Sequence, residues 1–164
     1  MPEGRGIFRS LTVRDNLRLQ GYASRRSVES GVDCALTAFP VLKRCLGQFA
    51  GQLSGGEQQM LALAGAYVSQ PRLILLDEVS LELAPRVVYE IFAALEPLAA
   101  TGVSIHLVEQ YVSRALLIAH QVVFLDHGAV AYSGPPSGLD EEALLEGYLG
   151  ISKEQQTPPT VTQA

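Results

Sequence analysis

Apolar positions in the first fifty residues recur at helical spacing. Helices are predicted over residues 11–17, 28–39 and 41–46, the first of them opened by Thr12 as N-cap. None of this stretch shows the strict alternation of a half-buried strand. Residues 12 to about 50 are therefore predicted to form a small helical lobe.

Beyond residue 53 the pattern changes to alternating helices and strands. The apolar run 73–76 has no alternation, which is typical of a parallel strand covered on both faces. His106 lies inside a second apolar run and is expected to be a packing residue. The predicted elements are a helix over 55–68, strand 73–76, a helix from Pro85, strand 103–108, helix 113–120, strands 121–125 and 129–133, and helix 139–149. This order predicts an α/β fold whose ligands bind at the carboxyl ends of parallel strands.

Composition narrows the classes of function. The chain is 48% apolar and 18% charged with a net charge of -5, an ordinary globular composition without the basic excess of a nucleic-acid binder. Cys34 and Cys45 lie eleven apart without metal-ligand or redox spacing. No run approaches the roughly 18 apolar residues that cross a bilayer. A cytosolic protein is expected, and any membrane role must come through a partner.

The segment Ser54-Gly55-Gly56-Glu57 has two interpretations. As local structure it is a capping box, in which the Ser54 hydroxyl and the Glu57 carboxylate satisfy each other's amides. As chemistry, two glycines leave the first amides of the helix uncovered, so that a phosphate can approach a positive helix end. Both interpretations use the same geometry.

Two adjacent acids, Asp77 and Glu78, end the buried apolar strand. They could merely open the next loop. At the end of a strand, however, the first carboxylate can hold Mg²⁺, and the second can orient and polarise the water that attacks a γ-phosphate.

Together these motifs resemble the ATPase subunit of a branched-chain amino-acid ABC importer, over nearly the whole chain. The resemblance rests on Leu-Ser-Gly-Gly-Glu-Gln-Gln at 53–59, Leu-Leu-Asp-Glu at 75–78, and Val-Glu-Gln at 108–110. It implies a partial P-loop NTPase fold, with a helical subdomain followed by a mostly parallel sheet and its covering helices. The implied domains are residues 1–52 for the Q-loop remnant and helical subdomain, 53–150 for the signature helix and core, and 151–164 for a disordered tail.

The resemblance also implies roles for individual residues. Glu78 is the catalytic glutamate, and Gln110 is the switch residue in a position where most of the family has His. Glu3 occupies the Q-loop position and, with Asp77, is the magnesium ligand. The signature that meets a nucleotide bound to the other subunit comprises Ser54, Gly55, Gly56, Glu57 and Gln58, and the D-loop comprises Ser80, Leu81 and Glu82.

ATP and Mg²⁺ are the implied cofactors, yet both need a phosphate loop. No Gly-x-x-x-x-Gly-Lys-Ser/Thr occurs in the 164 residues, and neither Lys43 nor Lys153 follows a strand and glycine loop. The chain alone is therefore expected to bind ATP poorly and to be inactive as an ATPase. Met1 falls where the family has Val, so the reading frame is expected to continue upstream into that loop; a true truncation is the alternative.

Three departures from the family pattern are expected to weaken hydrolysis without changing the fold. Val79 replaces a proline, Glu82 replaces a D-loop glycine, and Gly65 replaces an arginine of the signature helix. Glycine within a helix costs ~1 kcal/mol relative to alanine.

The implied partners are a second ABC ATPase subunit and membrane permease subunits, at the inner face of the cell membrane. Neither nucleic acid nor direct insertion into the membrane is expected. Two alternatives remain open. The chain could be a non-catalytic partner that lends its signature to an intact subunit, or an ABC-type ATPase of DNA repair.

Overall fold

The computed structural model describes residues 6–22, 27–81 and 83–139. It divides into two compact units, of which the first ends at Val112 and the second begins at Ser113. Glu3, Glu82, the predicted tail and all but the first residue of the predicted helix 139–149 lie outside the described residues. The predicted domain boundary at residue 52 remains a prediction.

The first part of the chain is helical, as predicted. Helices α1 (Val13–Gly21) and α2 (Val28–Ala38) are followed by two 3₁₀ helices, η1 (Pro40–Cys45) and η2 (Ala50–Gln52). The third predicted helix is thus a 3₁₀ rather than an α-helix, which suits a six-residue segment opened by a proline. The extended pairing described in this part is one isolated bridge between Thr12 and Phe49.

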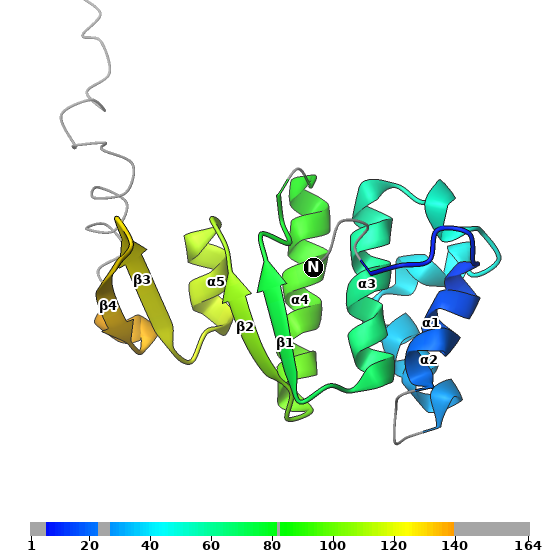
Figure 1. Ribbon diagram of the computed structural model, residues 1–164, viewed down its shortest axis with the longest axis horizontal. Helices are drawn as coiled ribbons and strands as arrows, with labels where there is room; N and C mark the ends of the chain where they lie inside the picture. Colours follow the sequence, from blue (N-terminus) through cyan, green and yellow to red (C-terminus); the bar gives the residue numbers. More distant parts are fainter. Residues whose placement is uncertain (1–5, 23–26, 82, 140–164) are drawn as a thin grey trace, which may run out of the picture. The chain divides into compact units, whose positions relative to one another are not determined.

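Helix α3 (Gly55–Ser69) lies between α1 and α2 on one side and α4 (Pro85–Ala100) on the other (Figure 1). It is apolar nearly all round because both sides are covered. The Tyr67 hydroxyl of α3 donates a hydrogen bond to the carbonyl of Ala94 in α4, and burial raises the pKa of Tyr67 to about 12. The core of this unit is therefore built around α3.

Strands β1 (Leu73–Asp77) and β2 (Ser104–Val108) pair in parallel, with Leu73 opposite Ser104 and Asp77 opposite Val108. This confirms the predicted parallel pairing. Helix α4 lies behind the two strands (Figure 1) and connects them.

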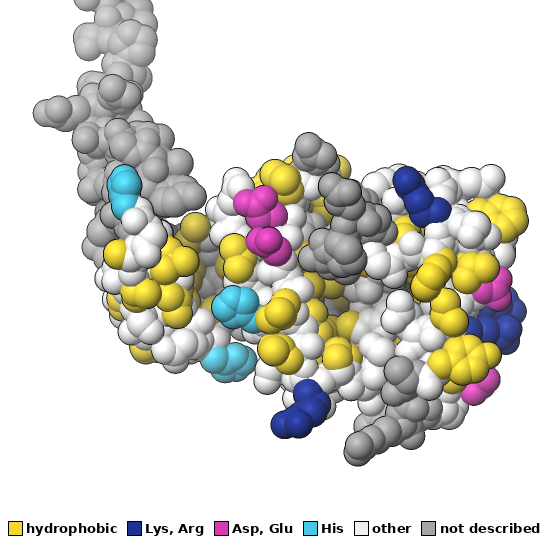
Figure 2. Space-filling view, viewed as in Figure 1, with side chains coloured by type: hydrophobic (Ala, Val, Ile, Leu, Met, Phe, Trp, Pro, Cys, Tyr) yellow, Lys and Arg dark blue, Asp and Glu magenta, His cyan; other side chains and the backbone are white. Residues whose placement is uncertain are grey.

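The prediction that strand 73–76 is covered on both faces is wrong for the described residues. Leu76 is 2% exposed, whereas Leu73 and Leu75 are 54% and 63% exposed. Successive side chains of a strand point to opposite faces, and within the described residues α4 covers one of them. His106 is exposed too, so its expected packing role is also wrong. Figure 2 shows apolar side chains on the face of the two strands that α4 does not cover.

The second unit contains a β-hairpin. Helix α5 (Val112–Ile118) leads to strands β3 (Val122–Asp126) and β4 (Ala129–Gly134), which pair antiparallel and are followed by the 3₁₀ helix η3 (Pro136–Gly138). The turn residues His127 and Gly128 have φ values of 46° and 80°, as a type I′ turn requires. The predicted strand-turn-strand is confirmed. No helix among the described residues has the length and apolar content to cross a membrane.

Candidate functional site

The carboxyl end of β1 brings together two residues that are 32 positions apart in the sequence. Gln110 Nε2 donates to Glu78 Oε1 at 2.7 Å, and the Glu78 amide donates to the Val108 carbonyl at 2.9 Å. Glu78 has a left-handed backbone with φ 46°, a conformation that costs a non-glycine residue about 1 kcal/mol or more. Both side chains are exposed, so the Glu78 carboxylate is held in place while remaining accessible.

The loop after Glu78 is fastened by a residue that the sequence did not single out. The Ser80 amide donates to Glu109 Oε1 at 3.0 Å, and the Ser80 hydroxyl donates to Glu109 Oε2. Ser80 is 2% exposed, and Leu81 beside it is 52% exposed. Glu109 was discoverable in principle, because it follows β2 directly and the carboxyl ends of parallel strands lie at the same edge of a sheet.

Val79, the first departure from the family pattern, is buried beside this loop. Its apolar side chain is thus placed in the core rather than in the candidate site. Gly65, the third departure, is buried in α3, where an added Cβ would lie 3.1 Å from Cγ of Gln20 in α1. The missing side chain therefore lets α1 and α3 approach each other.

The other candidate residues lie at the amino end of α3, where the predicted capping box forms. Ser54 donates to Glu57 Oε2 from its amide at 2.9 Å and from its hydroxyl at 2.7 Å, and the Glu57 amide donates to Ser54 Oγ at 3.3 Å. Hydrogen bonds from the Ser54 side chain and amide lower the pKa of Glu57 below its ordinary value. Gln58 Nε2 donates to the Leu53 carbonyl at 3.0 Å, which ties the signature to the residue before it.

We expect Ser54→Ala to lower the free energy of unfolding by about 1 kcal/mol at pH 7, because the first amides of α3 lose their cap. Since the folded-state pKa of Glu57 is lowered, its contribution is present above the ordinary Glu pKa of 4.5 and is lost as the pH falls through the folded value. The difference between wild type and variant should therefore shrink in acid. Urea unfolding at pH 7 and at pH 4 measures it. An equal difference at both values would contradict the role of the carboxylate.

Gly56 has a packing role that the phosphate interpretation did not anticipate. A Cβ built on Gly56 would lie 2.9 Å and 3.1 Å from the two γ-methyl groups of Val87 in α4. The glycine therefore permits the close approach of α3 and α4 at the amino end of α3. Gly56 thus has a structural reason to be glycine that is independent of any phosphate.

We expect Gly56→Ala to destabilise the chain by about 1–3 kcal/mol, because the new methyl group overlaps the branched side chain of Val87. The matched test is the double variant Gly56→Ala, Val87→Ala, which removes the overlapping methyl groups and should recover most of the loss. Thermal unfolding of the two single variants and the double variant decides it. Strictly additive effects would show that Val87 is not what excludes the alanine.

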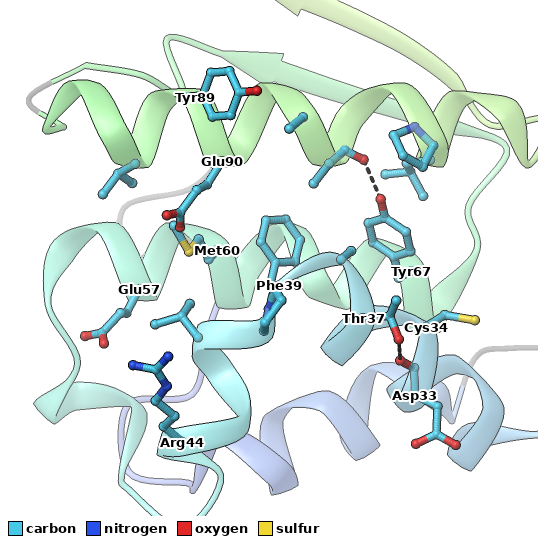
Figure 3. Close-up of a pocket in the computed structure, with 18 of the residues that line it drawn as sticks. Asp33, Cys34, Thr37, Phe39, Arg44, Glu57, Met60, Tyr67, Tyr89 and Glu90 are labelled. Atoms are coloured by element: carbon cyan, nitrogen blue, oxygen red, sulfur yellow. Dashed lines mark hydrogen bonds between the residues drawn. The ribbon is translucent and has the colours of Figure 1, made fainter.

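A groove of about 1120 Å³ lies between α4 on one side and α2 with η1 on the other, over α3 (Figure 3). Arg44 and Glu57 lie at one end of it, and Cys34 and Tyr67 at the other. It is lined by Ser54 and Glu57 of the signature, but not by Asp77, Glu78 or Gln110. The chemistry-bearing residues at the end of β1 therefore lie outside this groove.

Asn16 is a second polar residue that the sequence did not single out. It is 3% exposed, accepts from the Phe8 amide at 2.7 Å, and donates through Nδ2 to the carbonyls of Phe8 at 2.9 Å, Thr12 at 2.9 Å and Leu11 at 3.3 Å. One feature of the sequence pointed to its burial: Asn16 lies on a predicted helix, one residue before Leu17 and three residues after Val13, which are both buried. Asn16 fastens the segment that leads into α1.

The carboxylates at the end of β1 fit one kind of magnesium site. Asp77 and Glu78 are both exposed there, and no group of three metal-ligating side chains occurs among the described residues. Mg²⁺ is commonly held by one or two carboxylates together with substrate phosphates and water. The two carboxylates therefore fit a magnesium ion that is held together with the phosphates of a nucleotide.

Comparison with known proteins identifies the family. Residues 1–80 match the family model described as ABC transporter. The chain is 40% identical over 152 residues to the high-affinity branched-chain amino acid transport ATP-binding protein BraG of Pseudomonas aeruginosa, covering 92% of this chain and 65% of that protein. It is 38% identical over 148 residues to the probable branched-chain amino acid transport ATP-binding protein LivF of Archaeoglobus fulgidus, covering 89% of this chain and 63% of that one.

Solved structures show the same fold at lower identity. The cbiO1 protein of Clostridium perfringens, part of the ABC transporter complex cbiONQ, matches with a TM-score of 0.68 at 24% identity over 87% of this chain and 56% of its own. The dimeric ATP-binding cassette MJ0796 bound to ADP and Pi matches with a TM-score of 0.67 at 22% identity, over 82% and 60%. The α/β fold is thus that of an ABC ATPase cassette, of which this chain spans a part. The chain belongs to the ABC transporter family of ATP-binding proteins.

Proposed function

We propose that the chain is the ATP-binding and ATP-hydrolysing subunit of an ABC importer that powers the uptake of branched-chain amino acids. The observation that carries the ATPase role is the contact of Gln110 with Glu78 at the exposed end of β1, at 2.7 Å. The substrate class is supported by the 40% and 38% identity to two proteins named for branched-chain amino acid transport. Those two proteins are longer than this chain, which covers 65% and 63% of them. Both the ATPase activity and the transported substrate are therefore proposals for this chain.

Each residue of the candidate site has a separate role in this proposal. The Glu78 carboxylate orients the attacking water and accepts its proton, and Gln110 keeps that carboxylate in one position. Asp77 would hold the magnesium ion, which supplies positive charge to the phosphates. Ser54 and the amino end of α3 would present a positive helix end to the γ-phosphate of a nucleotide on another subunit.

The proposed assembly contains a second ATPase subunit and membrane permease subunits at the inner face of the cell membrane. The signature residues support it, because a helix end that binds the γ-phosphate in trans needs a nucleotide supplied by a partner. The proposed assembly also requires a phosphate loop to bind the nucleotide, and no such loop is found within the 164 residues. Glu3 and Glu82, whose roles are also proposed, lie outside the described residues.

Complementation tests the proposal. Deleting the coding sequence in the host should reduce the uptake of labelled leucine and leave glutamine uptake unchanged, and the wild-type gene should restore it. Ser54→Arg, which blocks the helix end, should fail to restore it. Unchanged leucine uptake after deletion would overturn the importer role. Full restoration by Glu78→Gln, with failure of Ser54→Arg, would instead show a non-catalytic partner.

A further inference from the structure

The segment that follows β1 is hydrogen-bonded at several points to the end of β2 and the two residues after it. The Glu78 amide bonds to the Val108 carbonyl, the Ser80 amide and hydroxyl bond to Glu109, and Gln110 bonds to the Glu78 side chain. The last residue of β2 and the two residues after it thus hold two positions of one short loop. The loop adds its own turn, in which the Leu81 amide donates to the Glu78 carbonyl at 3.2 Å.

Glu109 has a distinct place in this set of contacts. Each of its carboxylate oxygens accepts one hydrogen bond from Ser80, so the whole carboxylate is used on a residue that is 2% exposed. Hydrogen bonds to a charged acceptor are stronger than neutral ones. The contact also restrains Glu78, two residues earlier, whose left-handed backbone needs its surroundings to hold it.

We propose that Glu109 is a positioning residue that joins the loop carrying Ser80 and Leu81 to the Gln110–Glu78 pair. Leu81 is exposed beside the buried Ser80, so a partner surface that moves Leu81 pulls on Ser80 and, through Glu109, on the adjacent Gln110. Occupancy of the loop by a partner is thereby transmitted to the carboxylate that acts on water. This inference rests on the proposed ATPase function.

The test separates geometry from charge. Glu109→Gln keeps the side-chain length and one oxygen for the Ser80 amide, and its N–H₂ group can donate to the hydroxyl, which also accepts. Glu109→Asp keeps the charge but is one methylene too short. Glu109→Ala removes both contacts, and Glu96→Ala removes an exposed carboxylate of α4 as the matched control.

The first readout needs no nucleotide. In the full chain, Glu109→Ala and Glu109→Asp should speed hydrogen exchange of the Ser80 amide by about 10-fold or more, the effect of losing a hydrogen bond to a charged group, while Glu109→Gln stays closer to wild type. Glu96→Ala should not change it. Unchanged exchange of the Ser80 amide in Glu109→Ala would overturn the inference. So would slow exchange in Glu109→Asp with fast exchange in Glu109→Gln, because the charge of the side chain would then matter and not its length.

The second readout is ATP turnover by the transporter complex purified from its host through this chain. Glu109→Ala and Glu109→Asp should lower kcat by about 10-fold or more with KM for ATP unchanged, because positioning at the reacting atoms is lost and not nucleotide binding. Glu109→Gln should retain most of the rate. Faster Ser80 exchange with an unchanged kcat would overturn the coupling to Glu78. A wild-type complex without turnover would overturn the proposed function, while the exchange result still decides whether Glu109 positions the loop.

Discussion

Replacing Glu78 with glutamine is expected to lower the kcat of ATP hydrolysis by about 100-fold or more, the usual effect of removing a general base. The amide cannot accept a proton from the attacking water. It keeps the side-chain oxygen to which Gln110 donates, so the loop should retain its geometry. The affinity for ATP should stay within a factor of about two, because the variant removes an interaction made in the transition state.

Phosphate release by the transporter complex and binding of a labelled nucleotide measure the two effects separately. Glu96→Gln, at an exposed position of α4, is the matched control for loss of one negative charge. Since Glu78 is exposed as well, the variant should change the free energy of unfolding by less than about 0.5 kcal/mol. A Glu78→Gln complex that retains half of the wild-type rate would rule out Glu78 as the base.

The second large effect is expected at Asn16, where Asn16→Ala should lower the free energy of unfolding by about 2–4 kcal/mol. The substitution breaks contacts with Phe8, Leu11 and Thr12 at once. Each buried polar group left without a partner costs about 1–3 kcal/mol. The loss should be local in part, with faster hydrogen exchange of the Phe8 amide.

Asn16→Asp is the sharper variant, because it keeps the shape and replaces the Nδ2 donor with an oxygen that faces the same carbonyls. It should be as destabilising at pH 7 as the alanine variant. Arg14→Ala, at an exposed position of the same helix, should change stability by less than about 0.5 kcal/mol. Urea unfolding compares the three variants, and a loss below 1 kcal/mol for Asn16→Ala would show that the segment before α1 is held by other contacts.

The elements themselves were predictable because each depends on local pattern. Thr12 and Ser54 mark helix starts, and the predicted strands at 73–76 and 103–108 do pair in parallel. The type I′ turn at His127-Gly128 was signalled by its glycine. Within the candidate site, the meeting of Glu78 and Gln110 follows from two parallel strands that end at one edge of a sheet.

Contacts that depend on packing between distant segments could not be predicted from the pattern. An apolar run does not by itself show whether a strand is buried on one face or on both, because that depends on its neighbours. For this reason Leu75 and His106 are exposed although the pattern predicts that they are covered. The position of Glu109 at the end of β2 could be predicted, but its pairing with Ser80, 29 residues away, could not. The need for glycine at position 56 depends on Val87, a residue of another helix.

The buried phenol of Tyr67 sets an alkaline limit on the contact between α3 and α4. Because its folded-state pKa is raised to about 12, the stabilisation from keeping the phenol neutral is complete below the ordinary value of 10 and is lost as the pH rises through 12. Ionisation also removes the proton donated to Ala94, so this hydrogen bond between the two helices is lost as the phenolate forms. The chain has no tryptophan. The ultraviolet absorbance of tyrosinate at high pH comes from all six tyrosines, so the part of it that a Tyr67→Phe variant lacks records the loss of this hydrogen bond between α3 and α4.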